Sequence, residues 1–234
     1  MVTSGMNTVR MRNVLTSGDL SIEMPYSEVP GNTCAGPSAD ICRWIGHRMW
    51  VRANTAALRN TYGADLVVML VADQAVFVGV AYVQNDDCGE FAGYESTLGC
   101  DVGATYDGFA FSVISVPYAT SFQVFAHETG HQFGMQHQSA SGITPAYSWS
   151  FAKTRSGGTS QTVVGGLSLA RNLQYSNPNV FFIGTTEASG DASRFNALTG
   201  ACLAPAMSGF RTPGQVFTVF WDGFESHLVP VDGC

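Results

Sequence analysis

Residues 127–137 read His127-Glu128-Thr129-Gly130-His131-Gln132-Phe133-Gly134-Met135-Gln136-His137. On a helix, the first two histidines of this stretch stand four residues apart and share one face, so both imidazoles can reach one ion. Gly134 can end the helix and turn the chain sharply, which would bring His137 back as a third ligand. Three of the chain's five histidines fall in this stretch. The spacing therefore predicts a metal site.

The donor set indicates which metal and which chemistry to expect. Three neutral imidazoles suit Zn²⁺ at roughly 2.0–2.1 Å and leave a fourth coordination position for water, as in catalytic zinc sites. Glu128, beside the first ligand, is the natural general base for that water. The alternative is a solvated helix face with histidines that bind no metal. The glycine and the third histidine at their required offsets favour the metal site.

The residues around this stretch predict the limits of its helix. Thr120 or Ser121 is a plausible N-cap, and Gly134 marks the end. Four apolar residues are expected to form the buried side of the helix: Phe122, Phe125, Ala126 and Phe133.

The chain before this helix shows one helical pattern and several apolar runs. Apolar residues recur at helical spacing over residues 42–62, and Gly63 can end that helix. Residues 65–71 form a continuous apolar run, which predicts a strand buried on both faces. Residues 76–83 and 109–116 have the same character, and residues 84–108 between them predict a long loop. This order predicts an α/β or α+β sheet with helices packed on it.

Composition excludes several classes of protein. The chain has 234 residues, of which 45% are hydrophobic, so it can bury a substantial core. Eleven basic and 18 acidic residues give a net charge of −7, and without a basic cluster we expect no nucleic-acid partner. The apolar runs are too short for a membrane span.

Cysteine usage indicates an oxidising compartment. The six cysteines form no zinc-ribbon or redox CxxC pair, so disulfides and secretion are expected. The first residues lack a signal sequence, so we expect a mature chain whose leader is absent. Among 15 connectivities, nearest-neighbour pairing predicts Cys34 with Cys42, Cys88 with Cys100 and Cys202 with Cys234. In an alternative role, the Cys34 thiolate would block the zinc as part of a pro-segment.

Several segments together resemble a known family. Residues 62–68, 79–82, 125–128, 176–178 and 191–198, with the histidine stretch, are similar in order and spacing to metzincin metallopeptidases. Within the metzincins they resemble the bacterial reprolysin-like enzymes, including the peptidyl-Asp metalloendopeptidases. The resemblance covers about residues 45–200.

The resemblance implies an α+β fold and a function. It implies a twisted mixed β-sheet, an active-site helix and a smaller C-terminal lobe within a single domain spanning residues 1–234. The N-terminal lobe would cover about residues 1–134 and the C-terminal lobe about 135–234, with 205–234 as a candidate short extension. By carry-over, the three histidines would bind zinc, and Glu128 would be the base of a secreted endopeptidase that cleaves proteins or peptides. We expect a monomer.

One position departs from the metzincin pattern. These enzymes have a methionine in a tight turn below the zinc, and Val164 occupies the aligned position here. An apolar valine can still line the floor of the site. This departure is the support for one alternative, a non-catalytic zinc-containing binding or adhesion module on the same fold. A second alternative, which the ligand set alone leaves open, is a zinc hydrolase acting on a non-peptide bond.

Candidate substrate contacts lie after the third histidine and on the preceding strand. If the Asp preference of the relatives applied, Arg155, Lys153 or Arg171 could supply the cation. Tyr147 and Tyr175 are candidate donors to the developing oxyanion, although such tyrosines usually serve packing. The strand at 109–116 is the candidate sheet edge for an extended substrate, the alternative being an ordinary buried strand.

The remaining histidines and acidic residues have simpler interpretations. His47 and His227 are expected to be ordinary surface or core residues rather than ligands. Asp86, Asp87 and Glu90 could bind calcium, but they match no EF-hand loop, so a solvated acidic loop is the default.

Overall fold

A long helix, α1 (Ala39–Tyr62), begins the part of the chain that this computed structural model describes, namely residues 39–71, 78–84, 103–138 and 145–211. Gly63 ends it with a φ of 63°, a left-handed conformation that glycine adopts at little cost. The amide of Ala64 then donates to the Arg59 carbonyl at 3.0 Å, which closes the last turn. The predicted helix over 42–62 is confirmed and begins slightly earlier.

Three strands form a mixed sheet in the order β1-β3-β2. These are β1 (Val67–Val71), β2 (Gly79–Ala81) and β3 (Phe111–Ser115), each within a predicted run. β1 runs parallel to β3, with Val67 opposite Phe111, and β2 runs antiparallel to it, with Gly79 opposite Ile114. The central strand is therefore β3, and all five of its residues are buried.

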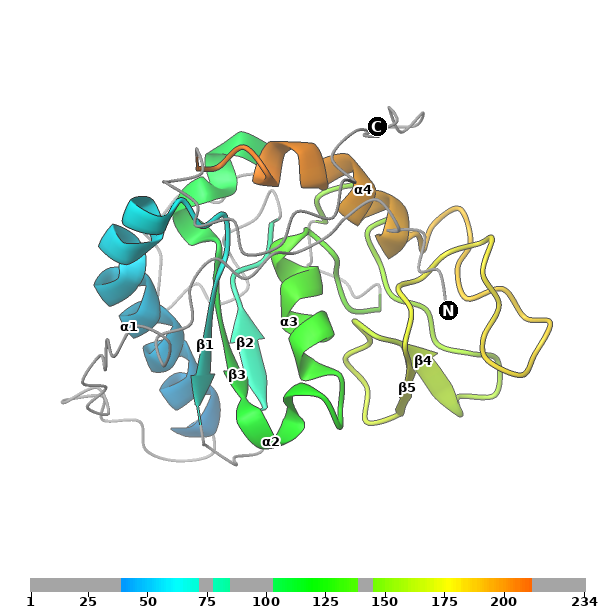
Figure 1. The fold of residues 1–234 in the computed structure, drawn as a ribbon. Helices are drawn as coiled ribbons and strands as arrows, with labels where there is room; N and C mark the ends of the chain where they lie inside the picture. Colours follow the sequence, from blue (N-terminus) through cyan, green and yellow to red (C-terminus); the bar gives the residue numbers. More distant parts are fainter. Residues whose placement is uncertain (1–38, 72–77, 85–102, 139–144, 212–234) are drawn as a thin grey trace, which may run out of the picture.

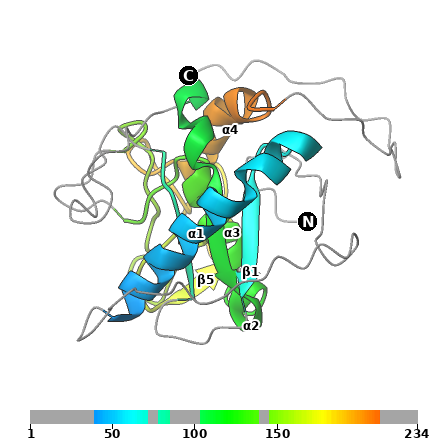
Figure 2. The ribbon, with the colours of Figure 1, turned by 90° about the vertical axis from the view of Figure 1, so that its left-hand side faces the viewer.

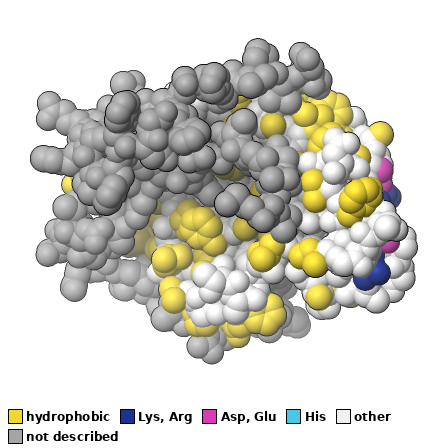
Figure 3. Space-filling model, turned by 45° about the vertical axis from the view of Figure 1, so that its right-hand side comes forward, with side chains coloured by type: hydrophobic (Ala, Val, Ile, Leu, Met, Phe, Trp, Pro, Cys, Tyr) yellow, Lys and Arg dark blue, Asp and Glu magenta, His cyan; other side chains and the backbone are white. Residues whose placement is uncertain are grey.

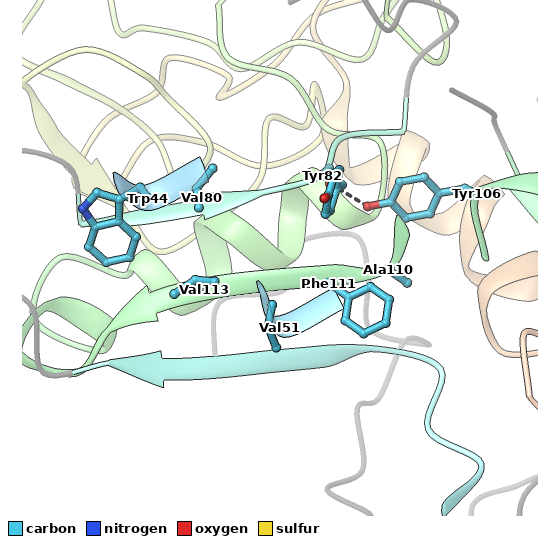
Figure 4. Close-up of a cluster of buried hydrophobic side chains, with 8 residues drawn as sticks. All are labelled: Trp44, Val51, Val80, Tyr82, Tyr106, Ala110, Phe111 and Val113. Atoms are coloured by element: carbon cyan, nitrogen blue, oxygen red, sulfur yellow. Dashed lines mark hydrogen bonds between the residues drawn. The ribbon is translucent and has the colours of Figure 1, made fainter. Parts of the chain in front are cut away.

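Helices cover both faces of the sheet (Figures 1 and 2). Phe111 and Val113 of β3 belong to a core cluster with Trp44 and Val51 of α1, whereas Ser112 and Ile114 alternate to the other side. Figure 4 shows this cluster, in which the Tyr106 hydroxyl donates to the Tyr82 carbonyl at 2.6 Å. On the opposite face of the sheet, α3 (Val124–Gln132) packs against β2 and β3.

Two predictions about this region are wrong. β1 is not buried on both faces, because it is an outer strand of the described sheet and 56% of Leu70 is exposed. Residues 84–108 are not all loop either, because Gly103–Phe109 forms the 3-10 helix η3. Tyr106 of this helix is buried in the core beside Phe109, and its burial holds the segment against the core.

The predicted N-cap of α3 is also wrong. Pro117 starts a separate short helix, α2 (Val116–Ala119), and Thr120 is its C-cap. The Ser121 hydroxyl donates back to the Pro117 carbonyl at 2.8 Å and so caps nothing downstream. The N-cap of α3 is Gln123, whose φ of 58° separates the two helices.

The C-terminal half is largely irregular and contains a second core. It holds a parallel pair of short strands, β4 (Ser160–Thr162) and β5 (Ala170–Asn172), and the helix α4 (Asn196–Met207). The second cluster joins the end of α3, the segment after β4 and α4. It contains Phe133, Met135, Val163, Val164, Leu203 and Met207.

The end of the described chain is tied back to its beginning by charged groups. The Arg211 backbone amide donates to an Asp65 carboxylate oxygen at 3.1 Å, and its guanidinium bonds to Asp107 and to Asn60. Asp107 also pairs at 2.8 Å with Arg59 near the end of α1. Two halves of the chain are therefore joined by one network.

The helices and the small mixed sheet make an α+β fold. None of the helices in the described ranges combines the length and apolarity needed to cross a bilayer. On the face in Figure 3, hydrophobic and uncharged polar atoms cover most of the described surface, in line with the 12% charged residues.

Several predictions lie outside the described residues. Cys202 on α4 is disulfide-bonded, but the predicted pairings involve cysteines for which no side chain is described. The loop acids Asp86, Asp87 and Glu90, and His227, also lie outside them.

Candidate metal centre

The helix α3 buries the polar side of its surface. His127, Glu128 and His131 are all buried, whereas 59% of Phe122 and 39% of Phe125 are exposed. The prediction that these two phenylalanines form the buried side is therefore wrong, although Phe133 is buried as expected. The helix instead turns its ionisable residues inward.

Gly134 turns the chain after α3 and returns it to the site. Its φ of 74° favours glycine, and a Cβ there would lie 2.7 Å from Leu203 Cδ1, so the Leu203 side chain would have to shift. The Gly134 amide donates to the His131 carbonyl and the Met135 amide to the Gly130 carbonyl. His137 thereby approaches the two helical histidines as the sequence predicts.

The three imidazoles converge through their Nε2 atoms. The distances between these atoms are 3.2 Å for His127 and His131, 3.0 Å for His131 and His137, and 3.1 Å for His127 and His137. Tetrahedral Zn²⁺ with bonds of about 2.0–2.1 Å needs ligand nitrogens about 3.3 Å apart. The three residues therefore form a group that fits one metal ion.

The other ring nitrogens show that lone pairs face the centre. His127 Nδ1 lies 2.9 Å from the Val163 carbonyl, and His131 Nδ1 lies 2.8 Å from the Met135 carbonyl. A carbonyl only accepts, so each Nδ1 carries the hydrogen and each Nε2 presents a lone pair. Lone pairs at these distances repel each other unless a cation lies between them, so the donor set fits a metal.

Burial keeps all three imidazoles neutral. It lowers the pKa of His131 to about 3 and that of His137 to about 4, and it holds the pKa of His127 well below its usual value. Neutral imidazole is the form that binds zinc. The histidines are therefore ready to bind at neutral pH.

Glu128 occupies a tight apolar place beside the triad. Burial raises its pKa to about 8, while the positive charges of Arg171 and Arg48 act in the opposite direction. A Cβ at Gly79 of β2 would lie 2.5 Å from Glu128 Oε1 and 2.7 Å from its Cγ. Gly79 thus makes room for the carboxylate, a role that the sequence analysis missed. A glycine inside a strand was the available signal, because it often marks a close approach.

A short segment after β4 lies directly against the triad. Val163 gives its carbonyl to His127, and Val164 is fully buried in the second core. A Cβ at Gly130 of α3 would lie 2.7 Å from Val164 Cγ2, and one at Gly166 would lie 2.7 Å from His137 Nδ1. The segment that contains Val164 therefore contacts α3 and His137 and holds the histidines in place.

The predicted substrate cations lie in different places. Arg171 is half-buried on β5, and its charge acts on Glu128 and on all three histidines. The Lys153 ammonium donates to the Ala188 carbonyl at 2.9 Å and lies 3.8 Å from Asp191. Arg155 is near Glu187, whose carboxylate binds the Ser156 amide. Only Arg171 is thus linked to the triad.

The two predicted tyrosines have other contacts. The Tyr175 hydroxyl donates to the Ala126 carbonyl at 2.9 Å, and the ring packs in the second core. Tyr147 stacks on Trp149 with ring centroids 5.0 Å apart. His47 is a buried core residue with an edge contact to Trp44. Of the two predicted settings, surface and core, the second is confirmed.

The predicted sheet edge is wrong, because residues 111–115 form the central strand, paired on both sides. β2, an outer strand of the described sheet, lies beside α3 (Figure 1). Val78 accepts from Ser115 and Tyr82 donates to Phe111, so these two residues face β3. The backbone groups of Gly79, which alternates with them, point away from the sheet.

Comparisons with known proteins agree with this geometry. The model of the family Reprolysin_5, described as metallo-peptidase family M12, matches residues 17–195. No curated protein matches the chain. A solved structure described as "Structure of a chaperone-substrate complex" superposes with a TM-score of 0.50 at 16% identity, over 72% of this chain. The matched part is 24% of that protein's chain, and the likeness concerns the fold alone.

Proposed function

The chain belongs to metallopeptidase family M12, and we propose that it is a zinc-dependent endopeptidase with Glu128 as its general base. The observation that supports the proposal is the convergence of three Nε2 atoms to within 3.0–3.2 Å of one another, beside a buried carboxylate. His127, His131 and His137 would hold the metal. When bound, zinc acidifies a water molecule and polarises the scissile carbonyl.

The protein's own groups then have defined tasks. The carbonyls of Val163 and Met135 hold two of the imidazoles in the tautomer that binds metal. Glu128 accepts the proton of the attacking water on its carboxylate and passes it to the leaving amine. Burial raises the pKa of Glu128 to about 8 without metal, which makes it a stronger base than an exposed glutamate, and a bound cation would favour its ionised form.

The substrate would bind in extended form along β2. The Gly79 backbone groups point away from β3 and lie beside Glu128, so a peptide added there would run past the carboxylate. Of the residues predicted for the substrate pocket, Arg171 is the one whose charge reaches the site, whereas Arg155 and Tyr147 have contacts elsewhere.

The setting of the enzyme is also part of the proposal. The six cysteines, with Cys202 in a disulfide, favour secretion into an oxidising compartment. We infer a monomer with one domain, its lobes meeting near residue 134, where α3 ends and the return to His137 begins. Protein or peptide substrates follow from the peptidase family.

One observation favours a second candidate function. Val164 stands where the resemblance calls for methionine, which would suit a binding module that keeps zinc without catalysis. The buried Glu128 beside the triad is the argument against it, because a module without catalysis has no use for a desolvated carboxylate there.

Cleavage-site profiling on a peptide library tests the proposal. Native protein, protein treated with a chelator and the variant Glu128→Gln are compared, with bound zinc measured in each. Glu187→Gln is the matched control, because Glu187 is a partly exposed carboxylate in the other half of the chain, where it accepts hydrogen bonds from Ser156.

We expect cleavage by native protein and by Glu187→Gln, none after chelation, and a loss of at least 10³-fold for Glu128→Gln with zinc retained. Cleavage that survives both chelation and Glu128→Gln would refute the mechanism. Zinc retention without cleavage by native protein would identify the binding module.

A further inference from the structure

His137 differs from the other two histidines in how its ring is held. His127 and His131 each donate through Nδ1 to a backbone carbonyl, but no described residue forms a hydrogen bond with His137 Nδ1. Ligand histidines usually have such an outer partner, which fixes the orientation of the ring. Among the described residues, the third imidazole is therefore oriented by packing rather than by a hydrogen bond of its Nδ1.

The ring of His137 packs against Gly166. A Cβ on Gly166 would lie 2.7 Å from Nδ1, 2.8 Å from Cγ and 3.2 Å from Cε1. The α-carbon of Gly166 therefore packs directly against the imidazole ring. The preceding residue, Gly165, has no room for a Cβ because the Gln161 side chain covers it. Two adjacent glycines form a backbone with high conformational freedom, so this support needs its own restraint.

Two side chains hold the peptide group between these glycines. The Gly166 amide donates to Gln138 Oε1 at 3.0 Å, and the Gly165 carbonyl accepts from Arg171 Nη2 at 3.4 Å. The N–H and the C=O of one peptide are thus both bound, and the described part of the chain gives them no other hydrogen-bond partner. The plane of this peptide is therefore set by side chains.

Both side chains are anchored at their other ends. Gln138 Nε2 donates to Thr154 Oγ1 at 3.0 Å and to Gln161 Oε1 at 2.9 Å. Arg171 Nη1 donates to the Phe122 carbonyl at 2.8 Å, just before the N-cap of α3. The peptide is consequently fixed relative both to the segment after His137 and to the start of the active-site helix.

We propose that Gln138 and Arg171 are positioning residues for His137, which they orient through the Gly165–Gly166 peptide. The inference rests on the proposed role of His137 as a zinc ligand. It gives Arg171 a task other than substrate binding. The two roles of Arg171 predict opposite changes in zinc affinity when the residue is replaced. A cation near the site repels Zn²⁺, so removing Arg171 would strengthen zinc binding if the residue acted only through its charge. Removal of a positioning residue would weaken zinc binding instead.

Zinc affinity of the full chain is the measurement, made by competition with a chromophoric chelator. The variants are Gln138→Met and Arg171→Met, their double variant, and the conservative variants Gln138→Glu and Arg171→Lys. Gln174→Met is the matched control, because the Gln174 side chain donates to the Phe181 carbonyl and forms no hydrogen bond with the Gly165–Gly166 peptide. Absorption spectra of the Co²⁺-loaded proteins report the ligand geometry, and thermal unfolding without metal reports stability.

We expect zinc to bind about 10- to 100-fold more weakly to Gln138→Met and to Arg171→Met, with altered Co²⁺ spectra. The double variant should bind zinc only slightly more weakly than the single variant with the larger loss of affinity, because both side chains act on one peptide. Arg171→Lys should recover much of the affinity. Gln138→Glu keeps an acceptor for the Gly166 amide but loses the two Nε2 donor bonds, so it should recover only part of the affinity. Gln174→Met should lower thermal stability comparably and leave zinc affinity unchanged.

Unchanged zinc affinity in Gln138→Met, or tighter binding in Arg171→Met, would overturn the proposal. A loss of zinc affinity in Gln174→Met as large as in Gln138→Met and Arg171→Met would also overturn it. If the native chain itself binds no zinc, the proposed function fails with it. If native protein binds zinc and cleaves peptides while Gln138→Met and Arg171→Met bind zinc equally well, only the positioning role of Gln138 and Arg171 is refuted.

Discussion

Replacing Gly79 with alanine should damage catalysis without removing the metal. A Cβ at this position would lie 2.5 Å from Glu128 Oε1, 2.7 Å from Glu128 Cγ and 2.7 Å from Val124 Cγ1. Ordinary contact needs at least about 3.4 Å, so Glu128 and β2 must separate by about 0.7 to 0.9 Å. Rotating the carboxylate cannot relieve the contact with Cγ, and the whole side chain or the strand must shift.

A displacement of about 1 Å in a catalytic group costs roughly 10²-fold in rate. We therefore expect kcat of Gly79→Ala to fall about 10²-fold on a peptide chosen from the library. Bound zinc should stay near that of native protein, because the three histidines lie on α3 and on the segment that follows it. The pattern should resemble that of Glu128→Gln, since both changes act on the same carboxylate.

Gly209→Ala is the control for this substitution. Its Cβ would lie 3.6 Å from the nearest atom, which is ordinary contact, so kcat should not change. A kcat of Gly79→Ala within twofold of native protein would show that β2 does not confine Glu128. A loss of zinc in parallel with kcat would show that the defect lies in the metal site instead.

Three other predictions follow from the site. Gly166→Ala should weaken zinc binding at least 10-fold, because its Cβ would lie 2.7 Å from His137 Nδ1; chelator competition within twofold of native protein would contradict this. Val164→Met should lower the free energy of unfolding by about 1–3 kcal/mol in urea, since Val164 is fully buried against Gly130 and a longer side chain must displace its neighbours; equal stability would show that methionine fits. Without metal, the free energy of unfolding should fall as pH falls from about 6.5 to about 4, because the unfolded chain takes up protons on His131 and His137 that the folded chain, with pKa values of about 3 and about 4, refuses. His137→Gln should make this pH dependence shallower in chelator, and an unchanged slope would count against the assignment.

The sequence predicts the convergence of the three histidines because its determinants are local. The helical spacing of His127 and His131 and the turn at Gly134 depend on nearby backbone geometry, which the residues themselves dictate. The partners of Nδ1 could not be predicted, because the Val163 carbonyl comes from a segment 36 residues away. The same holds for Gly79, whose closeness to Glu128 depends on how the strands are ordered.

Errors at the start of α3 have a physical cause. Ser121 is a good N-cap residue, but Pro117 four residues earlier favours a separate turn and supplies a carbonyl for its hydroxyl. Gln123 then adopts a left-handed conformation that is rare outside glycine and that no pattern indicates. Phe122 and Phe125 look like core residues only if the helix has an apolar side, and here its inner side holds the ionisable residues.

The network around Arg211 also bears on how the protein is made. Arg211 is separated from Asp65 by 146 residues and from Asp107 by 104, so these contacts can form only after almost the whole described chain has left the ribosome. Until then Asp65 and Asp107 must remain paired with Arg59 or with water. We therefore expect the N-terminal half to complete its folding late in synthesis, with the packing of α4 against η3 as one of the last events.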